Sequence, residues 1–112
     1  MSDFSEYQRR ARTTAVYPGQ HTFTGLAYAA LGLAGEAGEV SNKVKKILRD
    51  DRANVTPERR AAIAAEIGDC LWYLANLCEE MRLDMGEVAE DNLDVLADRY
   101  GRDMIRGDGD QR

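Results

Sequence analysis

The chain has 112 residues, of which 31% are charged and 44% hydrophobic, and its formal net charge is -5. This length favours one domain with a modest core, and the negative charge argues against binding a nucleic acid polymer, whose phosphates need Lys and Arg. Apolar runs fall short of the ~20 residues of a membrane helix, and the N-terminus lacks the pattern of a secretion signal. We therefore expect a cytoplasmic protein with no membrane partner.

Capping signals predict four helices, and we find no pattern typical of β-strands. Asp3 and Asp84 are each followed three residues later by a glutamate, the capping box that starts a helix. Thr56 precedes a proline, a strong start because threonine caps well and proline suits the first helical position. Thr22 or Thr24 caps the remaining helix. The first predicted helix covers about residues 4–13, and the second runs from about 23 or 25 to 48 or 49. The third runs from 57 to about 81 or 82 and the fourth from 85 to about 100 or 101, so the fold is all-α.

One domain accounts for the ordered chain. We expect residues 1–105 to form it and 106–112, which are rich in glycine and charge, to be a disordered tail. Cys70 and Cys78 lie two turns apart on one predicted helix, roughly 12 Å by the helical rise. This separation is too long for a disulfide, so both are predicted to be buried thiols.

Two acidic pairs organise the chain. Glu36 and Glu39 lie on the second predicted helix, and Glu66 and Asp69 lie on the third. Residues three apart point from the same face of a helix, so each pair can act on one ligand. Each pair also flanks an apolar stripe with the same spacing in both helices. The two stripes are Leu33, Ala37, Val40, Val44 and Ile47, and Ile63, Ile67, Cys70, Leu74 and Leu77.

The short connection between these helices predicts an antiparallel hairpin packed stripe to stripe. In such a hairpin, residues equally far from the turn face each other. Glu36 and Asp69 are equally far from a midpoint between residues 52 and 53, and so are Glu39 and Glu66. The sequence therefore predicts that four carboxylates meet at one level, on one side of the hairpin.

Four converging carboxylates repel one another unless a cation neutralises them. A ligand set made only of oxygen favours Mg²⁺, with Mn²⁺ possible, over zinc. A di-iron bundle is disfavoured because the sole histidine, His21, is not part of a Glu-x-x-His motif. Mg²⁺ held by carboxylates leaves positions for water and substrate phosphates. Hydrolysis of a phosphate ester or anhydride is the leading chemistry.

Gly38 and Gly68 occupy equivalent positions, each directly before the second acid of its pair. A glycine inside a helix costs up to about 1 kcal/mol relative to alanine, so we expect a reason for both. The absence of a side chain lets another helix approach behind the acidic site. We expect a homodimer or higher homo-oligomer to supply part of this cover, with the first and fourth helices as the alternative.

The run from Gly32 to Val40, GLAGEAGEV, followed after 25 intervening residues by Glu66-Ile67-Gly68-Asp69, resembles the MazG-type all-α nucleoside triphosphate pyrophosphohydrolases. Their signature is Glu-x-x-Glu, a spacer, then Glu-x-x-Asp. The resemblance implies a four-helix MazG-like bundle that hydrolyses a nucleoside triphosphate to monophosphate and pyrophosphate with Mg²⁺. It implies that all four acids are metal ligands, with a glutamate, Glu39 or Glu36, orienting or deprotonating the attacking water.

Four further residues are candidate substrate contacts. Lys43 follows Glu39 by one turn and Tyr73 follows Asp69 by one turn, so both can reach phosphate oxygens. The resemblance implies a substrate contact for Asn92 on the fourth helix. His21 lies near the start of the second helix and is a candidate for the base. The alternatives are a solvated lysine, a packed tyrosine, a capping asparagine and an exposed histidine.

Within this resemblance, we expect house-cleaning of non-canonical or deoxynucleoside triphosphates. A related all-α activity, hydrolysis of phosphoribosyl-ATP, is the alternative enzyme. A helical interaction module without catalysis is the alternative from another class. Such a module would be expected to have lost part of the acidic set, and all four acids are present here.

Overall fold

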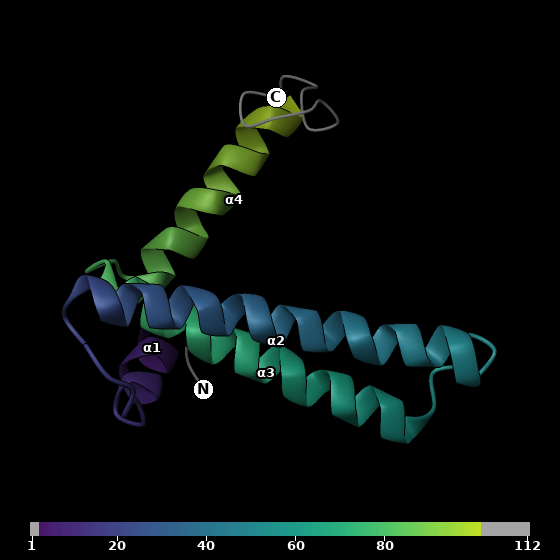
Figure 1. Ribbon diagram of the computed structural model, residues 1–112. Coiled ribbons are helices and arrows are strands. Elements are labelled where there is room, and N and C mark those ends of the chain that lie inside the picture. The colour runs from purple at the N-terminus through teal and green to yellow at the C-terminus, as the bar shows by residue number, and fades with distance from the viewer. Residues whose placement is uncertain (1–2, 102–112) are drawn as a thin grey trace.

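The computed structural model describes residues 3–101 and is all-α, as predicted (Figure 1). The helices are α1 (Phe4–Arg12), α2 (Phe23–Asp50), α3 (Pro57–Glu80) and α4 (Met85–Gly101). The predicted tail, residues 106–112, lies outside the described residues. A search of the described helices finds no stretch with the length and hydropathy of a membrane span.

Local hydrogen bonds explain where the helices begin. Side-chain oxygens of Asp3, Thr56 and Asp84 accept backbone N–H groups of the first turns of α1, α3 and α4, at 2.8, 3.1 and 2.8 Å. These are the caps that the sequence predicts. Thr22 stands at the N-cap position of α2, but its hydroxyl donates to the Gly19 carbonyl at 2.6 Å. Thr22 therefore closes the preceding turn instead of capping the helix.

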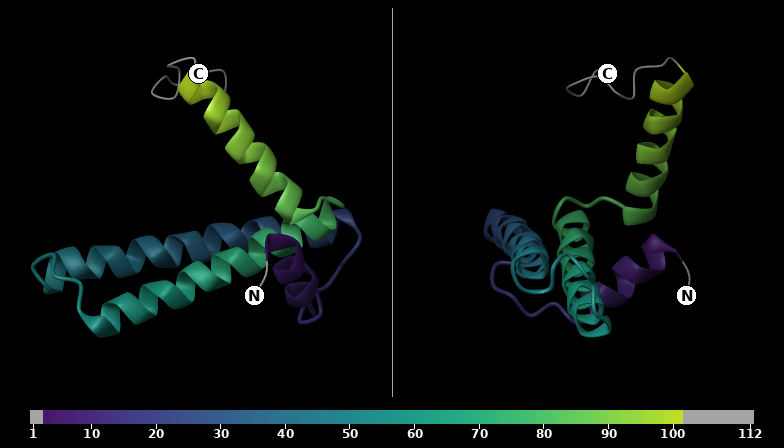
Figure 2. Two further views of the ribbon diagram at one scale, coloured as in Figure 1. Left: turned by 180° about the vertical axis from the view of Figure 1, so that it is seen from behind. Right: turned by 90° about the vertical axis from the view of Figure 1, so that its right-hand side faces the viewer.

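Helices α2 and α3 form the predicted antiparallel hairpin and lie side by side in all views (Figures 1 and 2). The chain reverses at Arg52 and Ala53, which both have positive φ angles, 53° and 64°. This position is the midpoint inferred from the acidic pairs. The Arg59 guanidinium donates to Asp51 at 2.8 Å and ties the start of α3 to the end of α2.

The face that α2 turns to α3 differs from the predicted stripe. Val44 and Ile67, expected in the contact, are 43% and 50% exposed, whereas Glu36 and Glu66 are half-buried. Small residues at the start of α2 allow α3 to approach closely on a rotated face. The residues of α2 that are at least half-buried on this face are Gly25, Ala29, Gly32, Glu36, Val40, Lys43 and Ile47.

Helix α1 packs across α3 and covers Trp72. Ala11, Ala75 and Met85 form the buried cluster at this junction, against which Trp72 packs. Helix α4 contacts α1 and then projects away from the hairpin, so that much of it is free of the other helices (Figure 2). The end of the hairpin near α1 is therefore the packed end.

Candidate functional site

Three carboxylates meet where α2 and α3 face each other. One oxygen from each of Glu36, Glu66 and Asp69 lies within 4.8 Å of the other two. Glu36 and Glu66 come from the contact between the helices, and Asp69 adds its side chain one turn further along α3 at the edge of the hairpin. An arrangement of three carboxylates at this spacing suits a hard divalent cation.

The raised pKa of Glu36 reflects the unfavourable free energy of bringing the three carboxylates together. Its hydrogen bond with Glu66 raises the pKa of Glu36 to about 7, and burial together with the charges of Glu66, Asp69 and Glu39 acts in the same direction. The second oxygen of Glu66, Oε2, is buried and has no hydrogen-bond partner within the described chain. A buried carboxylate oxygen without a partner is costly, and a cation would satisfy it.

Lys43 belongs to this site. Its Nζ lies 3.6 Å from Oε1 of Glu66, and both side chains are largely buried. Lys43 therefore supplies part of the positive charge that the carboxylates need, and it places an ammonium group where a substrate phosphate could bind. This position argues against the alternative of a solvated lysine.

Three of the four carboxylates that were predicted to converge come together in the structure. Glu39 is exposed and lies outside the group formed by Glu36, Glu66 and Asp69. The rotation of α2 accounts for this: it brings Glu36 into the contact with α3 and leaves Glu39 on the flank. Glu39 still raises the pKa of Glu36, as the last of several causes after the Glu66 hydrogen bond. Glu39 therefore lies beside the cluster, close enough for its charge to affect the pKa of Glu36.

A pocket of about 310 Å³ opens beside the carboxylates and is lined by Glu36, Asp69, Trp72 and Tyr73. The Tyr73 ring lies so close to the α2 backbone that a Cβ atom added at Gly32 would be 2.1 Å from the ring. Burial raises the pKa of Tyr73, as do Tyr28, Glu36 and Asp69. Gly32 is thus the position where the α2 backbone makes room for the tyrosine that walls the pocket.

Replacing Gly32 by alanine is expected to destabilise the protein by about 1–3 kcal/mol, because the added methyl overpacks the Tyr73 ring. The gain in helix propensity of up to about 1 kcal/mol offsets only part of this. Gly35→Ala is the matched control, since a Cβ there meets nothing within 4 Å, and it should stabilise the protein. Urea unfolding measures both changes; equal stability of the two variants would contradict this account of Gly32.

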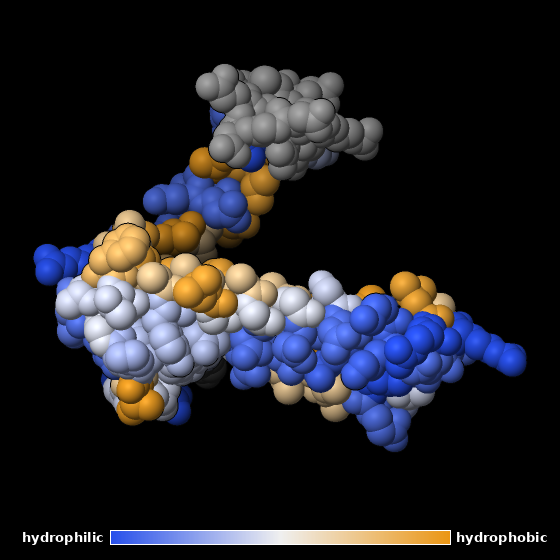
Figure 3. Space-filling model, in the orientation of Figure 1, coloured by the Kyte–Doolittle hydropathy of each residue, from blue (hydrophilic) through white to orange (hydrophobic). Residues whose placement is uncertain are grey.

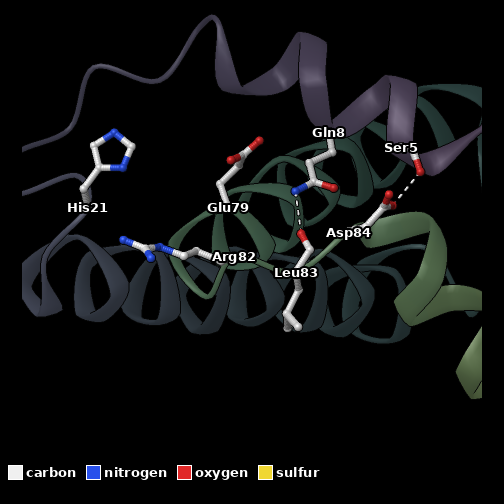
Figure 4. Close-up of a pocket in the computed structure, with 7 residues that line it drawn as sticks. All are labelled: Ser5, Gln8, His21, Glu79, Arg82, Leu83 and Asp84. Carbon is white, nitrogen blue, oxygen red and sulfur yellow. Dashed lines mark hydrogen bonds between the residues drawn. The ribbon is translucent and has the colours of Figure 1, made fainter.

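His21 lies in a different place. Its backbone N–H donates to Glu80 at 2.9 Å, and its side chain lines a second pocket of about 520 Å³ with Glu79, Arg82 and other polar residues (Figure 4). Glu80 follows Asp69 by eleven residues on α3, which is about 16 Å along the helix. Within the single chain, His21 is therefore separate from the acidic pocket.

Asn92 is also separate from the carboxylates. It is exposed on α4, which projects away from the hairpin (Figure 1). Val88 and Val95, one turn before and after, are exposed as well. The spacing of these three residues places them on one face of α4, and within the single chain this face lies away from the acidic site.

Three residues near the site escaped the sequence analysis. Trp72 was not among the predicted site residues, yet it lines the acidic pocket. Tyr28 lies beside Tyr73, and the Cys70 thiol has its pKa raised by burial and by the charges of Glu36 and two other carboxylates. Tyr28 precedes Glu36 by eight residues, close to the same helical face, and this spacing was the signal available for it.

Comparison with known proteins identifies this arrangement. Residues 25–101 match the MazG nucleotide pyrophosphohydrolase domain, a match that spans both acidic pairs and the hairpin. The chain belongs to the MazG family. It is 45% identical over 109 residues to the Gene 37 protein of Mycobacterium phage L5, a match that covers 95% of this chain and 96% of that protein. A search of solved structures finds no match.

Family membership explains why acids stand in a helix contact that apolar residues could fill. MazG proteins are nucleotide pyrophosphohydrolases, and the carboxylates of this chain form the kind of oxygen-ligand cluster that a divalent metal needs. A divalent cation at this cluster would offset the cost of bringing three acids together.

Proposed function

We propose that this MazG protein hydrolyses a nucleoside triphosphate between its α and β phosphates, giving nucleoside monophosphate and pyrophosphate with Mg²⁺. The observation that carries the proposal is the cluster of Glu36, Glu66 and Asp69, with ligand oxygens within 4.8 Å of one another. The unpartnered buried oxygen of Glu66 supports a bound cation. Mn²⁺ has the same preference for oxygen and is the alternative ion.

The three clustered acids and Glu39 would hold the metal, which would polarise the phosphoryl oxygens and stabilise the charge that develops on them. Lys43 adds a positive charge beside Glu66, suited to the oxygens of the leaving pyrophosphate. Glu39 is exposed at the edge of the cluster, a position from which it could orient or deprotonate the attacking water. Glu36, with a pKa of about 7 in the metal-free site, is the alternative base.

The aromatic wall of the pocket supports a nucleotide substrate. Trp72 and Tyr73 line it next to Glu36 and Asp69, and bases stack readily on aromatic rings. Phosphoribosyl-ATP is the alternative substrate. We infer a house-cleaning role on non-canonical or deoxynucleoside triphosphates.

The decisive assay incubates the protein with Mg²⁺ and a panel of canonical, deoxy and modified nucleoside triphosphates, and measures pyrophosphate. We expect release from at least one substrate, and a fall in kcat of about 10²-fold or more in Glu39→Gln and in Asp69→Asn. Release of no pyrophosphate from any substrate, or undiminished activity in both variants, would overturn the proposal.

We propose that the protein acts as a homodimer or higher homo-oligomer. Exposed apolar side chains occur along the hairpin and on α4 (Figure 3), among them Ile67 and Val88, and a Cβ at Gly38 or Gly68 would meet nothing within 4 Å among residues 3–101. A second copy would cover these faces and could bring Asn92 or His21 to the acidic pocket. Light scattering is expected to give at least twice the 12.5 kDa chain mass; a monomer at micromolar concentration would exclude this.

A further inference from the structure

A buried polar network joins α1, the connector after it and the end of α3. The Arg12 guanidinium donates to the Tyr17 hydroxyl at 2.7 Å, to Asn76 at 3.0 Å and to Glu80 at 3.0 Å. The Tyr17 hydroxyl in turn donates to Glu80 at 2.5 Å. The Glu80 side chain is fully buried and Arg12 is 14% exposed. This network fixes the position of Tyr17 against α3.

A buried ion pair is weak evidence for stability, because desolvation offsets much of the attraction. Burial raises the pKa of Glu80, but hydrogen bonds from Tyr17, His21 and Arg12 outweigh it and lower the pKa overall. Glu80 therefore stays charged and uses both oxygens, since the His21 N–H donates to Oε1 at 2.9 Å. The network therefore holds the connector between α1 and α2, which carries Tyr17 and His21, in a fixed position against α3.

The ring of Tyr17 connects this network to three other aromatic rings, two of them by direct contact. It stacks on Tyr28 with centroids 4.9 Å apart and planes 8° from parallel, and it meets the edge of Trp72 at 6.2 Å. Trp72 in turn meets Tyr73 edge to face at 5.0 Å. Tyr28 also lies close enough to Tyr73 to raise the pKa of its hydroxyl. Both neighbours of the Tyr17 ring thus contact Tyr73.

Two of these rings form the wall of the acidic pocket. Trp72 and Tyr73 line it together with Glu36 and Asp69, although Tyr17 does not line this pocket. The ring contacts therefore connect the polar network at the end of α3 to the site beside the carboxylates. The carboxylates themselves lie outside this chain of contacts.

We propose that Tyr17, anchored by Arg12 and Glu80, is a positioning residue for substrate binding. Its ring holds Tyr28 and Trp72, and these place Tyr73 where a substrate would contact it. The inference rests on the proposed function, in that the bound molecule is the nucleoside triphosphate. It assigns a role in the site to the connector between α1 and α2, which carries none of the acids.

The test compares Tyr17→Leu, which removes the ring, with Tyr17→Phe, which keeps it. Loss of the ring contacts is expected to raise KM for the nucleotide about fivefold, with kcat and the Mg²⁺ concentration for half-maximal activity within twofold of wild type. Tyr17→Phe should restore KM to within twofold. Val16→Ala is the control, because this neighbour is 92% exposed and should change nothing.

A second variant guards against misfolding of Tyr17→Leu. Tyr28 is exposed enough that Tyr28→Phe should fold normally, and loss of the hydroxyl that interacts with Tyr73 is expected to raise KM about threefold. Wild-type KM in both folded Tyr17→Leu and Tyr28→Phe would overturn the inference. So would equal impairment of Tyr17→Phe and Tyr17→Leu.

The sole tryptophan, Trp72, gives a readout that does not depend on hydrolysis. Removal of the Tyr17 ring is expected to increase quenching of Trp72 fluorescence by acrylamide about twofold, while Tyr17→Phe should match wild type. Equal quenching in the three proteins would overturn the positioning role. Absence of pyrophosphate release by wild type, with the quenching difference present, would instead overturn the proposed function alone.

Discussion

Replacing Glu66 by glutamine is expected to lower kcat/KM about 10³-fold. Glu66 lies at the centre of the site, where it hydrogen bonds with Glu36 and pairs with Lys43 at 3.6 Å. A metal that stabilises developing charge contributes several kcal/mol to the transition state, and each 1.36 kcal/mol is a factor of ten in rate. Pyrophosphate release at saturating Mg²⁺ measures the loss.

The same substitution should leave the chain folded and raise the melting temperature of the metal-free protein. Neutral glutamine removes the repulsion among the carboxylates and the charge on a buried oxygen that has no partner in the described chain. Glu90→Gln is the matched control, because Glu90 is exposed on α4 away from the site, and should alter neither quantity. Activity above a tenth of wild type in Glu66→Gln would mean that Glu66 is not a metal ligand.

Much of the fold follows from short-range chemistry, which is why it could be predicted. Asp3, Thr56 and Asp84 cap helices because their side-chain oxygens reach backbone N–H groups a few residues away. The reversal at Arg52 and Ala53 was inferred from equal distances along the chain. A short connection leaves an antiparallel pair little choice of register.

The rotation of the hairpin could not be read from apolar spacing. Packing of a glycine backbone against an aromatic ring decides it, as at Gly32 and Tyr73, and that contact joins residues far apart in the sequence. Hydrophobic periodicity favoured a face with Val44 and Ile67, which are partly exposed in the single chain. Because this face determines which acids meet, Glu36 joins Glu66 and Asp69, whereas Glu39 lies beside them.

The direction of α4 and the hydrogen bonds of Arg12 could not be predicted from the sequence, for a related reason. Arg12 contacts Asn76 and Glu80, more than 60 positions away, and its own surroundings in the sequence suggest only a solvated basic run. Helix α4 has an apolar face with Val88 and Val95, but its spacing does not say which surface covers it. In both cases the sequence identifies the residues without their partners.

The metal-free protein is expected to lose stability as pH rises from about 5 to 8. The pKa of Glu36 is about 7 in the folded protein and 4.5 when unperturbed, so between these values the folded state holds a proton that the unfolded state has released. Stability from this group is therefore fully present below pH 4.5 and is lost as pH rises through 7. Thermal unfolding in the presence of a chelator measures the trend.

Mg²⁺ should reverse this loss, because the ion competes with the proton for the same carboxylates. At a hundredfold excess over its Kd, a ligand that binds only the folded state contributes about 2.7 kcal/mol, which corresponds to roughly 10–20 °C in Tm for a chain of this size. The shift should be larger at pH 8 than at pH 5, since ionised Glu36 binds the metal.

Glu36→Gln separates this site from the other titrating groups. The variant has no proton to lose at position 36, so the fall in Tm between pH 5 and 8 should be largely absent, and the Mg²⁺ shift should shrink. Glu90→Gln should behave as wild type. A Tm shift by Mg²⁺ that is equal at both pH values, or that survives in Glu36→Gln, would place the ion elsewhere on this acidic chain. The carboxylates at the hairpin would then have to be explained without a metal.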